Sequence, residues 1–228
     1  MSHALDSPTD QPILVTDFDG TLTRRDFYRL VMERLIPPGT PDYWSAYRAG
    51  ALTHFDALRL TFEAARGGES ALVEVTQAME LVPTLAADLA MLREAGWGVV
   101  VVSAGCAWYI ERLLGEAGVS LDVFANPGRI EGGRVIMRRP DDSPYFSEET
   151  GVDKSAVVRA ALRGGRAVAF AGDGPPDLAP ALLVPGSLRF ARAGADLAEA
   201  LSERGESFQP FESWSEVARS LAGRGVSN

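Results

Sequence analysis

Four short apolar segments set the strongest constraint on how this chain folds. In each segment the apolar residues are largely consecutive and do not alternate with polar residues, as they would in a strand with one face in water. Strands buried on both faces of a parallel sheet have this character. The segments span residues 13–15, 99–102, 167–170 and 187–190. They predict a parallel β-sheet that is covered on both sides.

Amphipathic helical patterns lie between these segments. The clearest, residues 84–95, has leucines at helical spacing and stops at Gly96. Residues 107–117 and 155–162 repeat the form, each with a glycine near its end. Alternating strands and helices predict right-handed crossovers. The expected fold class is therefore α/β, with a doubly wound parallel sheet.

The segment 23–81 departs from this alternation. It contains several helical patterns and no convincing strand, with Pro- and Gly-rich joints at "PPGTP" and "RGGES". We expect a small helical domain over residues 23–81, inserted into an α/β core of residues 1–22 and 82–228. It would lie over the carboxyl edge of the sheet, where open α/β sheets bind ligands. Gly132-Gly133 predicts the turn of a later β-hairpin.

Composition excludes some classes of partner. The hydrophobic content of 46% and charged content of 23% are typical of a soluble globular protein. A formal net charge of −9 argues against nucleic acid and against an anionic membrane surface. We expect a small phosphorylated metabolite as the partner, bound by a monomer or homodimer. The acidic chain would need a metal ion or local donors to bind such an anion.

Location is predicted from cysteine usage and hydropathy. Cys106 is the only cysteine, so an internal disulfide is impossible and a reducing compartment is expected. No apolar stretch is long enough to span a bilayer, and the polar residues 1–12 do not resemble a signal peptide. We therefore expect a cytoplasmic protein.

Reactive side chains follow the apolar segments. Asp17 and Asp19 follow the first, Ser103 the second, and Asp173 the third, with Asp177 four residues later. The carboxyl ends of parallel strands converge on one crevice. Paired carboxylates repel unless a cation neutralises them, and an all-oxygen ligand set suits Mg²⁺. Turn and helix-cap roles are the alternative for Asp173 and Asp177, but the first pair of aspartates favours a magnesium site.

The two aspartates of "DFDGT" can do different jobs. Residues i and i+2 on a strand point to opposite faces, so both reach one site only if the chain curls, which Gly20 permits. One carboxylate could attack phosphorus as a nucleophile, while the other protonates the leaving oxygen and later activates water. Ser103 and nearby backbone N–H groups could hold the phosphoryl oxygens. Lys154 could neutralise their charge.

These motifs resemble those of the haloacid dehalogenase superfamily, in the right order across nearly the whole chain: "DFDGT", Ser103, Lys154 before a helix, and "GDGPPD". The resemblance implies a Rossmann-like core, Asp17 as nucleophile and Asp19 as general acid/base. It implies Mg²⁺ held by Asp17, the Asp19 carbonyl and Asp173, with Asp177 close or linked through water. The phosphate-binding residues would be Ser103, Ala104, Lys154, Gly20 and Thr21. The helical insertion is similar to the C1 cap of that superfamily.

Within the superfamily the chain resembles the phosphoserine phosphatase-type branch, which includes methionine-salvage phosphatases that act on an enediol phosphomonoester. Asp26 stands where both groups place an acidic residue. Pro176 replaces the usual Asn of "GDGxND", and no arginine matches the one that binds the substrate carboxylate. Arg59 lies nearby, but the register points to Thr61 or Phe62. Asp26 and Arg59 are the candidate specificity residues, and a methionine-salvage-type or other small phosphomonoester is favoured over phosphoserine.

The predicted function is therefore a Mg²⁺-dependent phosphatase that works through an aspartyl-phosphate. Alternatives are a phosphoserine phosphatase, a phosphotransferase or mutase on the same fold, and a silent phospho-ligand binding module. The intact aspartate pair argues against a binding module, since a protein that only binds its ligand needs no acid/base residue. His54 is expected on the surface of the helical insertion. Packing roles are expected for five aromatic residues: Trp108, Tyr109, Tyr43, Trp44 and Tyr47.

Overall fold

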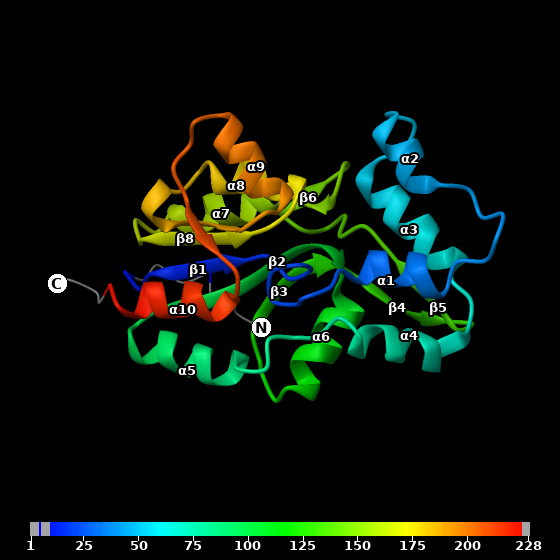
Figure 1. Cartoon of the computed structure of the whole chain (residues 1–228), viewed down its shortest axis with the longest axis horizontal. Coiled ribbons are helices and arrows are strands. Elements are labelled where there is room, and N and C mark those ends of the chain that lie inside the picture. The colour runs from blue at the N-terminus through cyan, green and yellow to red at the C-terminus, as the bar shows by residue number, and fades with distance from the viewer. Residues whose placement is uncertain (1–4, 6–9, 225–228) are drawn as a thin grey trace.

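A parallel sheet forms the centre of the molecule. The computed structural model describes Leu5 and residues 10–224. Within them the main sheet has six strands in the order β10-β9-β8-β1-β2-β3, and every pair is parallel (Figure 1). The strands are β1 (Ile13–Thr16), β2 (Gly98–Cys106), β3 (Asp122–Asn126), β8 (Val168–Gly172), β9 (Arg189–Arg192) and β10 (Gln209–Phe211). The chain winds outward from β1 in both directions, so the predicted doubly wound fold is confirmed.

Helices cover both faces of the sheet (Figure 1). Helices α5 (Leu85–Glu94), α6 (Ala107–Glu116) and α10 (Trp214–Ala222) lie on one face, and α7 (Lys154–Leu162), α8 (Leu178–Ala181) and α9 (Asp196–Glu203) on the other. Leu14 of β1 joins the apolar cluster on the first face, while Ile13 and Val15 join the cluster on the second. Burying each such side chain stabilises the fold by about 1.5–3 kcal/mol. Burial on both faces explains the non-alternating apolar pattern.

The edges of the sheet differ from the sequence prediction. Strands β3 and β10 were not predicted, because β3 is only partly buried and β10 is three residues long with a proline at its centre. The predicted strand 187–190 is also shifted. Residues Gly186–Leu188 form a short 3₁₀ helix, and the strand begins at Arg189. Short or half-exposed edge strands carry little apolar signal.

Residues between β1 and α5 form a helical insertion. Its helices are α1 (Phe27–Arg34), α2 (Tyr43–Arg48), α3 (His54–Ala64) and α4 (Gly68–Gln77). Side chains of Asp26, Asp42 and Thr53 accept hydrogen bonds from backbone N–H groups at the starts of α1, α2 and α3. An isolated bridge pairs Thr23 with Leu81. The insertion lies beyond the carboxyl ends of the strands (Figure 1).

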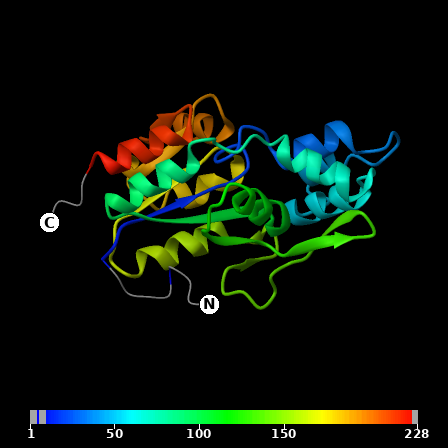
Figure 2. The ribbon, with the colours of Figure 1, turned by 90° about the horizontal axis from the view of Figure 1, so that it is seen from below.

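A hairpin from the second half of the chain supports the insertion. Strands β4 (Gly128–Glu131) and β5 (Arg134–Met137) are antiparallel, and both turn glycines have positive φ, as predicted. Val135 and Met137 are buried in the same apolar cluster as residues of α3 and α4. Figure 2 shows the hairpin running along the helical insertion. A second, shorter pair, β6 (Phe146–Ser147) and β7 (Gly151–Val152), follows. The insertion is therefore packed against elements outside residues 23–81.

Two sequence predictions concern location. Searching the described part of the chain reveals no helix with the length and apolar character needed to cross a membrane. The absence of a signal peptide was predicted from residues 1–12, and most of these lie outside the described residues. The cytoplasmic assignment therefore stays a prediction.

Candidate active site

Three aspartates meet at the carboxyl edge of the sheet. Asp17 directly follows β1 and Asp173 directly follows β8, and these strands are hydrogen-bonded neighbours. Asp177 ends the 3₁₀ turn Pro175–Asp177 that comes after β8. One carboxylate oxygen from each residue lies within 4.8 Å of the others. Asp17 and Asp173 converge as predicted, but the third member of the group is Asp177 and not Asp19.

The charges of this acidic cluster are only partly balanced. Burial and the neighbouring Asp177 raise the pKa of Asp17 well above its usual value, and they raise the pKa of Asp173 to about 7. Lys154 Nζ lies 2.7 Å from Asp17 Oδ1 and 2.6 Å from Asp177 Oδ1. Lys154 thus pairs with two of the three carboxylates, and the charges of Lys154 and Arg192 only partly oppose the raised pKa of Asp173. The residues present fit a divalent cation, because its charge would favour ionised carboxylates and oxygen ligands suit Mg²⁺.

Lys154 begins α7 and is buried. Burial alone would disfavour its charge, but Asp17 and Asp177 outweigh this effect and raise the pKa of the ammonium above its usual value. It is the chain's single lysine, since the other basic residues are arginines. The predicted basic group of the site is therefore fixed in the charged state, against the carboxylate predicted to be the nucleophile.

Asp177 organises the loop after β8. Its Oδ1 accepts a hydrogen bond from Lys154, and its Oδ2 accepts hydrogen bonds from the backbone N–H groups of Asp173, at 3.1 Å, and Gly174, at 3.0 Å. Gly172 leaves no room for a side chain, since a Cβ there would lie 2.6 Å from Asp177 Cγ. Both carboxylate oxygens are engaged, so Asp177 holds Asp173 and Lys154 in place. Direct ligation of a metal by Asp177 stays a prediction.

Asp19 occupies a different environment from Asp17. Its Oδ1 accepts a hydrogen bond from the Phe27 backbone N–H at 3.0 Å, and its Oδ2 accepts one from the Tyr109 hydroxyl at 2.6 Å. Burial and the charge of Asp26 raise the pKa of Asp19 to about 7, although both hydrogen bonds oppose the rise. A carboxyl group that titrates near neutral pH can serve as acid and then as base.

The turn between these aspartates depends on Gly20. Its φ of +70° is the left-handed conformation that glycine adopts without strain. A Cβ at this position would also overlap the Asp173 carboxylate. Thr21 is buried, and its hydroxyl lies 3.5 Å from Asp173 Oδ1. Gly20 and Thr21, predicted to bind phosphate, thus contact the side chain of Asp173.

Ser103 lies within β2, which corrects the prediction that this residue ends the strand. The strand runs on to Cys106, but its pairing with β3 shifts register between Val102 and Cys106, as at a β-bulge. The Ser103 hydroxyl accepts a hydrogen bond from the Gly105 backbone N–H at 2.9 Å. Ser103 and Ala104 face the same cavity as Asp17 and Lys154, as expected for phosphate-binding groups.

A cavity of about 870 Å³ joins the acidic cluster to the helical insertion. Most of the predicted site residues line it: Asp17, Asp19, Gly20, Asp26, Ser103, Ala104, Lys154, Asp173 and Asp177. Arg59 does not line this cavity. Its guanidinium lies 3.3 Å from Asp56 and 3.0 Å from Glu63, both on α3. These pairs, three and four residues away, hold Arg59 along its own helix.

Three of the five aromatic residues line the cavity, which corrects the sequence prediction in part. Trp44, Tyr47 and Tyr109 line the cavity, whereas Tyr43 and Trp108 do not. His54, predicted on the surface, is only 8% exposed and also lines the cavity. Burial and the charge of Lys154 lower the pKa of His54 to about 4, so its ring is neutral at physiological pH.

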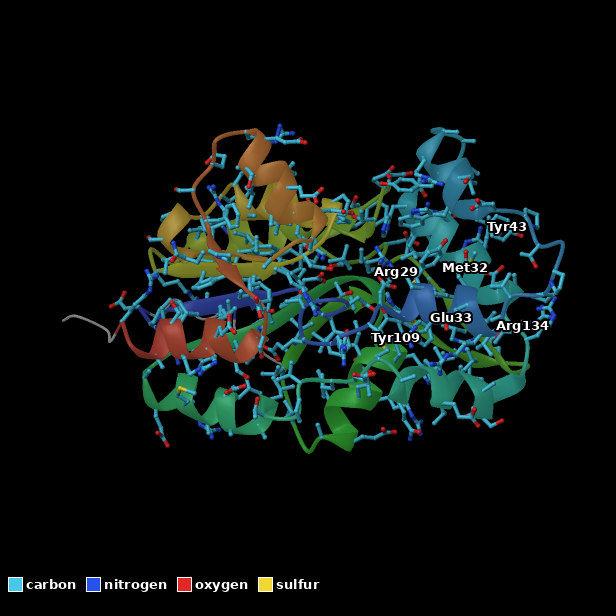
Figure 3. All side chains as sticks on the ribbon, in the orientation of Figure 1. Arg29, Met32, Glu33, Tyr43, Tyr109 and Arg134 are labelled. Atoms are coloured by element: carbon cyan, nitrogen blue, oxygen red, sulfur yellow. The ribbon has the colours of Figure 1, made fainter. Side chains whose placement is uncertain are left out.

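Sequence reasoning missed two polar contacts. Tyr109 was assigned to packing, yet its hydroxyl binds Asp19, and its ring stacks on Phe27 with centroids 4.2 Å apart. Figure 3 shows Tyr109 at the junction of α6 and the insertion. Arg192, at the end of β9, donates hydrogen bonds to the backbone carbonyls of Gly20 and Thr23. The only sequence feature that could have indicated a site role for Arg192 is its position just after an apolar segment.

Solved structures with this fold include a HAD family hydrolase of Salmonella enterica serovar Typhi. It has a TM-score of 0.65 and 17% identity, covering 88% of this chain and 67% of that one. A phosphoserine phosphatase solved as a phospho-aspartyl intermediate analogue has a TM-score of 0.66 and 16% identity, and the match covers 92% of this chain and 99% of that one. Phosphoserine phosphatase from T. onnurineus has a TM-score of 0.61 and 19% identity, and the match covers 96% of this chain and 98% of that one. At these identities the similarity establishes the fold.

The sequence itself matches the model of a protein family. The comparison with curated proteins gives no match. The haloacid dehalogenase-like hydrolase family matches residues 14–181, which include the acidic cluster, Lys154 and all of β1 except its first residue. This match covers well over half of the chain, in agreement with the fold and the site. The chain belongs to the haloacid dehalogenase-like hydrolases.

Proposed function

We propose that this hydrolase is a Mg²⁺-dependent phosphatase that cleaves a small phosphomonoester through an aspartyl-phosphate on Asp17. The supporting observation is the pairing of two unlike carboxyl groups in one cavity. Asp17 lies against Lys154 in the acidic cluster, and Asp19 is held apart by Tyr109 and the Phe27 backbone. Phosphoserine phosphatases among the structural relatives support the same chemistry.

Each residue has a separate role in this proposal. An Asp17 oxygen attacks phosphorus, and the bond from phosphorus to the leaving oxygen breaks as Asp19 donates its proton to that oxygen. Asp19 then removes a proton from the water that hydrolyses the aspartyl-phosphate. Lys154, Ser103 and backbone N–H groups bind the phosphoryl oxygens. Magnesium, held by Asp17, Asp173 and the Asp19 carbonyl, would neutralise phosphoryl charge.

The helical insertion would serve as a C1-type cap. It faces the acidic cluster across the cavity, and Thr23 and Leu81 pair where it leaves the core. Closure over the substrate would exclude water during attack, and opening would release the alcohol. Asp26, at the start of α1, would contact the organic part of the substrate.

Substrate identity is a finer proposal. Of the two positions where the register would place a carboxylate-binding arginine, Thr61 donates its hydroxyl to the Ala57 carbonyl, and Phe62 is buried beside the cavity. Neither of these two side chains can pair with a carboxylate, so phosphoserine would have to use an arginine at another position, such as Arg25, Arg29 or Arg48 of the cavity lining. A methionine-salvage-type enediol phosphate remains a candidate of the small phosphomonoester class.

An assay with p-nitrophenyl phosphate, with Mg²⁺ or with a chelator, tests the proposal. We expect turnover that depends on Mg²⁺ and falls by at least about a thousandfold in Asp17→Asn. Asp142→Asn, an exposed position outside the cavity, is the matched control and should retain activity. Absence of turnover on a broad panel of phosphomonoesters with Mg²⁺ would refute the proposed function.

A further inference from the structure

The helical insertion lines the cavity with a group of aromatic rings, beside the arginines Arg24, Arg25, Arg29 and Arg48. We define the aromatic wall as Tyr28 of α1, Trp44 and Tyr47 of α2, and His54 of α3, all of which line the cavity. Ring centroids lie 4.8 Å apart for Tyr28 and Trp44, and 5.1 Å apart for Trp44 and Tyr47. His54 lies edge-on to both rings of α2, at 5.4 Å from each. The four rings therefore form one continuous surface.

The core uses this aromatic surface only in part: Tyr28 and Trp44 pack against the main apolar cluster, but neither is buried. None of the side chains of α2 is buried, so Trp44 and Tyr47 remain partly exposed although large aromatic residues usually fill cores. Phe27 and Phe62, by contrast, are buried in the apolar cluster beneath the wall. Aromatic area left uncovered inside a cavity, beside a few polar groups, is the usual character of a ligand site.

His54 adds an uncommitted polar group to the wall. Its backbone N–H donates to Glu149, which fixes the start of α3 against the core. The imidazole ring makes no hydrogen bond to any described residue, and its Nδ1 is buried without a partner. A buried histidine kept for stability normally has both ring nitrogens satisfied. The ring therefore lines the cavity with hydrogen-bonding capacity that no described residue uses.

We propose that the aromatic wall is the leaving-group subsite and that it selects phosphomonoesters whose alcohol carries a planar aromatic ring. This inference rests on the proposed function, because a phosphoryl group at Asp17 and Lys154 directs its alcohol across the cavity toward the insertion. Stacked and edge-to-face contacts with the wall would recognise the ring. A cavity of about 870 Å³ has room for both parts of such a substrate.

A matched substrate series tests the inference. Benzyl phosphate, cyclohexylmethyl phosphate and phosphoserine present a planar ring, a saturated ring of equal size, and a small charged alcohol. We expect kcat/KM for benzyl phosphate to exceed that for cyclohexylmethyl phosphate by about tenfold, and that for phosphoserine by about a hundredfold. Equal values for the two ring substrates would overturn the inference while leaving the proposed function intact.

A binding measurement covers the case in which no substrate is turned over. Benzylphosphonate and methylphosphonate share the anionic group and differ in the ring. Calorimetry with Mg²⁺ should give about tenfold tighter binding of benzylphosphonate. Equal affinities would overturn the inference. Tighter binding without hydrolysis of any phosphomonoester would support the subsite and refute the proposed function.

Variants of α2 assign the effect to the wall. Trp44→Ala should lose about tenfold of the preference for benzyl over cyclohexylmethyl phosphate, while Trp44→Phe, which retains a ring, should keep most of it. Tyr43→Ala is the matched control, because Tyr43 is an aromatic residue of the same helix that lies outside the cavity (Figure 3). Thermal unfolding of each variant verifies folding. An unchanged preference in folded Trp44→Ala would overturn the inference.

Discussion

The two sides of the cavity are built in different ways. On the sheet side, buried polar groups are held by several contacts each: Asp177 alone binds Lys154 and two backbone N–H groups. On the insertion side, the aromatic wall is carried by short helices, and its rings are held by contacts with one another. In our proposal the sheet provides the groups that do the chemistry, and the insertion provides the groups that select the substrate.

Removing the positive charge from the sheet side should have the largest effect. Lys154→Met would leave Asp17 and Asp177 buried without their partner, at a cost of about 3–5 kcal/mol in the free energy of unfolding. Urea unfolding measures the loss, and activity should disappear with it. Arg159→Met, an exposed arginine on the same helix, should cost less than about 1 kcal/mol. A stable Lys154→Met protein would contradict the rigid description of the sheet side.

The turn at Gly20 provides a second test of that rigidity. Gly20→Ala would meet both an unfavourable φ and the Asp173 carboxylate, so Asp173 must move. We expect activity to fall by about a hundredfold and the Mg²⁺ requirement to rise. Gly39→Ala is the matched control, since Gly39 has a φ of +84° and no atom within 4 Å of an added Cβ. It should cost about 1 kcal/mol of stability and keep its activity. Equal activity losses in the two variants would show that Asp173 is not displaced.

Tyr109 lies where the two sides of the cavity meet, and replacing it tests whether it supports acid catalysis by Asp19. Tyr109→Phe should weaken proton donation by Asp19, because one of its two hydrogen bonds is lost. Hydrolysis of an alkyl phosphate should slow by about tenfold or more, since its alcohol needs that proton. p-Nitrophenyl phosphate, with a better leaving group, should be affected much less. Equal losses for both esters would argue against a role in acid catalysis.

The attachment of the insertion should give the smallest effect. Arg139 lies 2.9 Å from Asp56 and stacks over the Phe55 ring at 4.5 Å, linking the segment after β5 to α3. Arg139→Ala should cost about 1 kcal/mol and raise the rate of proteolysis within the insertion while the core stays resistant. Arg138→Ala, whose ion pair with Glu131 is exposed and 4.0 Å long, is the control. If proteolysis of the insertion is as slow in Arg139→Ala as in the unmodified protein, other contacts hold the insertion in place.

Sequence reasoning succeeded on the sheet side because its signals are local. Apolar segments buried on both faces are recognisable, Asp17 and Asp173 directly follow β1 and β8, and Asp19 comes two residues after Asp17. The edge strands β3 and β10 escaped because one is partly buried and the other is short.

The insertion side depends on packing that no local pattern records. Arg59 and His54 lie on one helix, yet Arg59 pairs with its own helix while His54 faces the cavity. Five aromatic residues looked alike in sequence, and only the orientation of α2 and α6 separates those in the cavity from the others. The roles assigned to the site residues, and the boundaries at residues 23 and 81, stay predictions.

The single lysine of the chain has a practical consequence. Apart from an α-amino group, an amine-directed reagent has one target on the unmodified protein, and that nitrogen is enclosed by two carboxylates at the bottom of the cavity. Because these carboxylates hold the ammonium in its charged form, the amine should react slowly unless both ion pairs break. Its labelling rate would therefore report the loss of these ion pairs together with access of the reagent to the cavity.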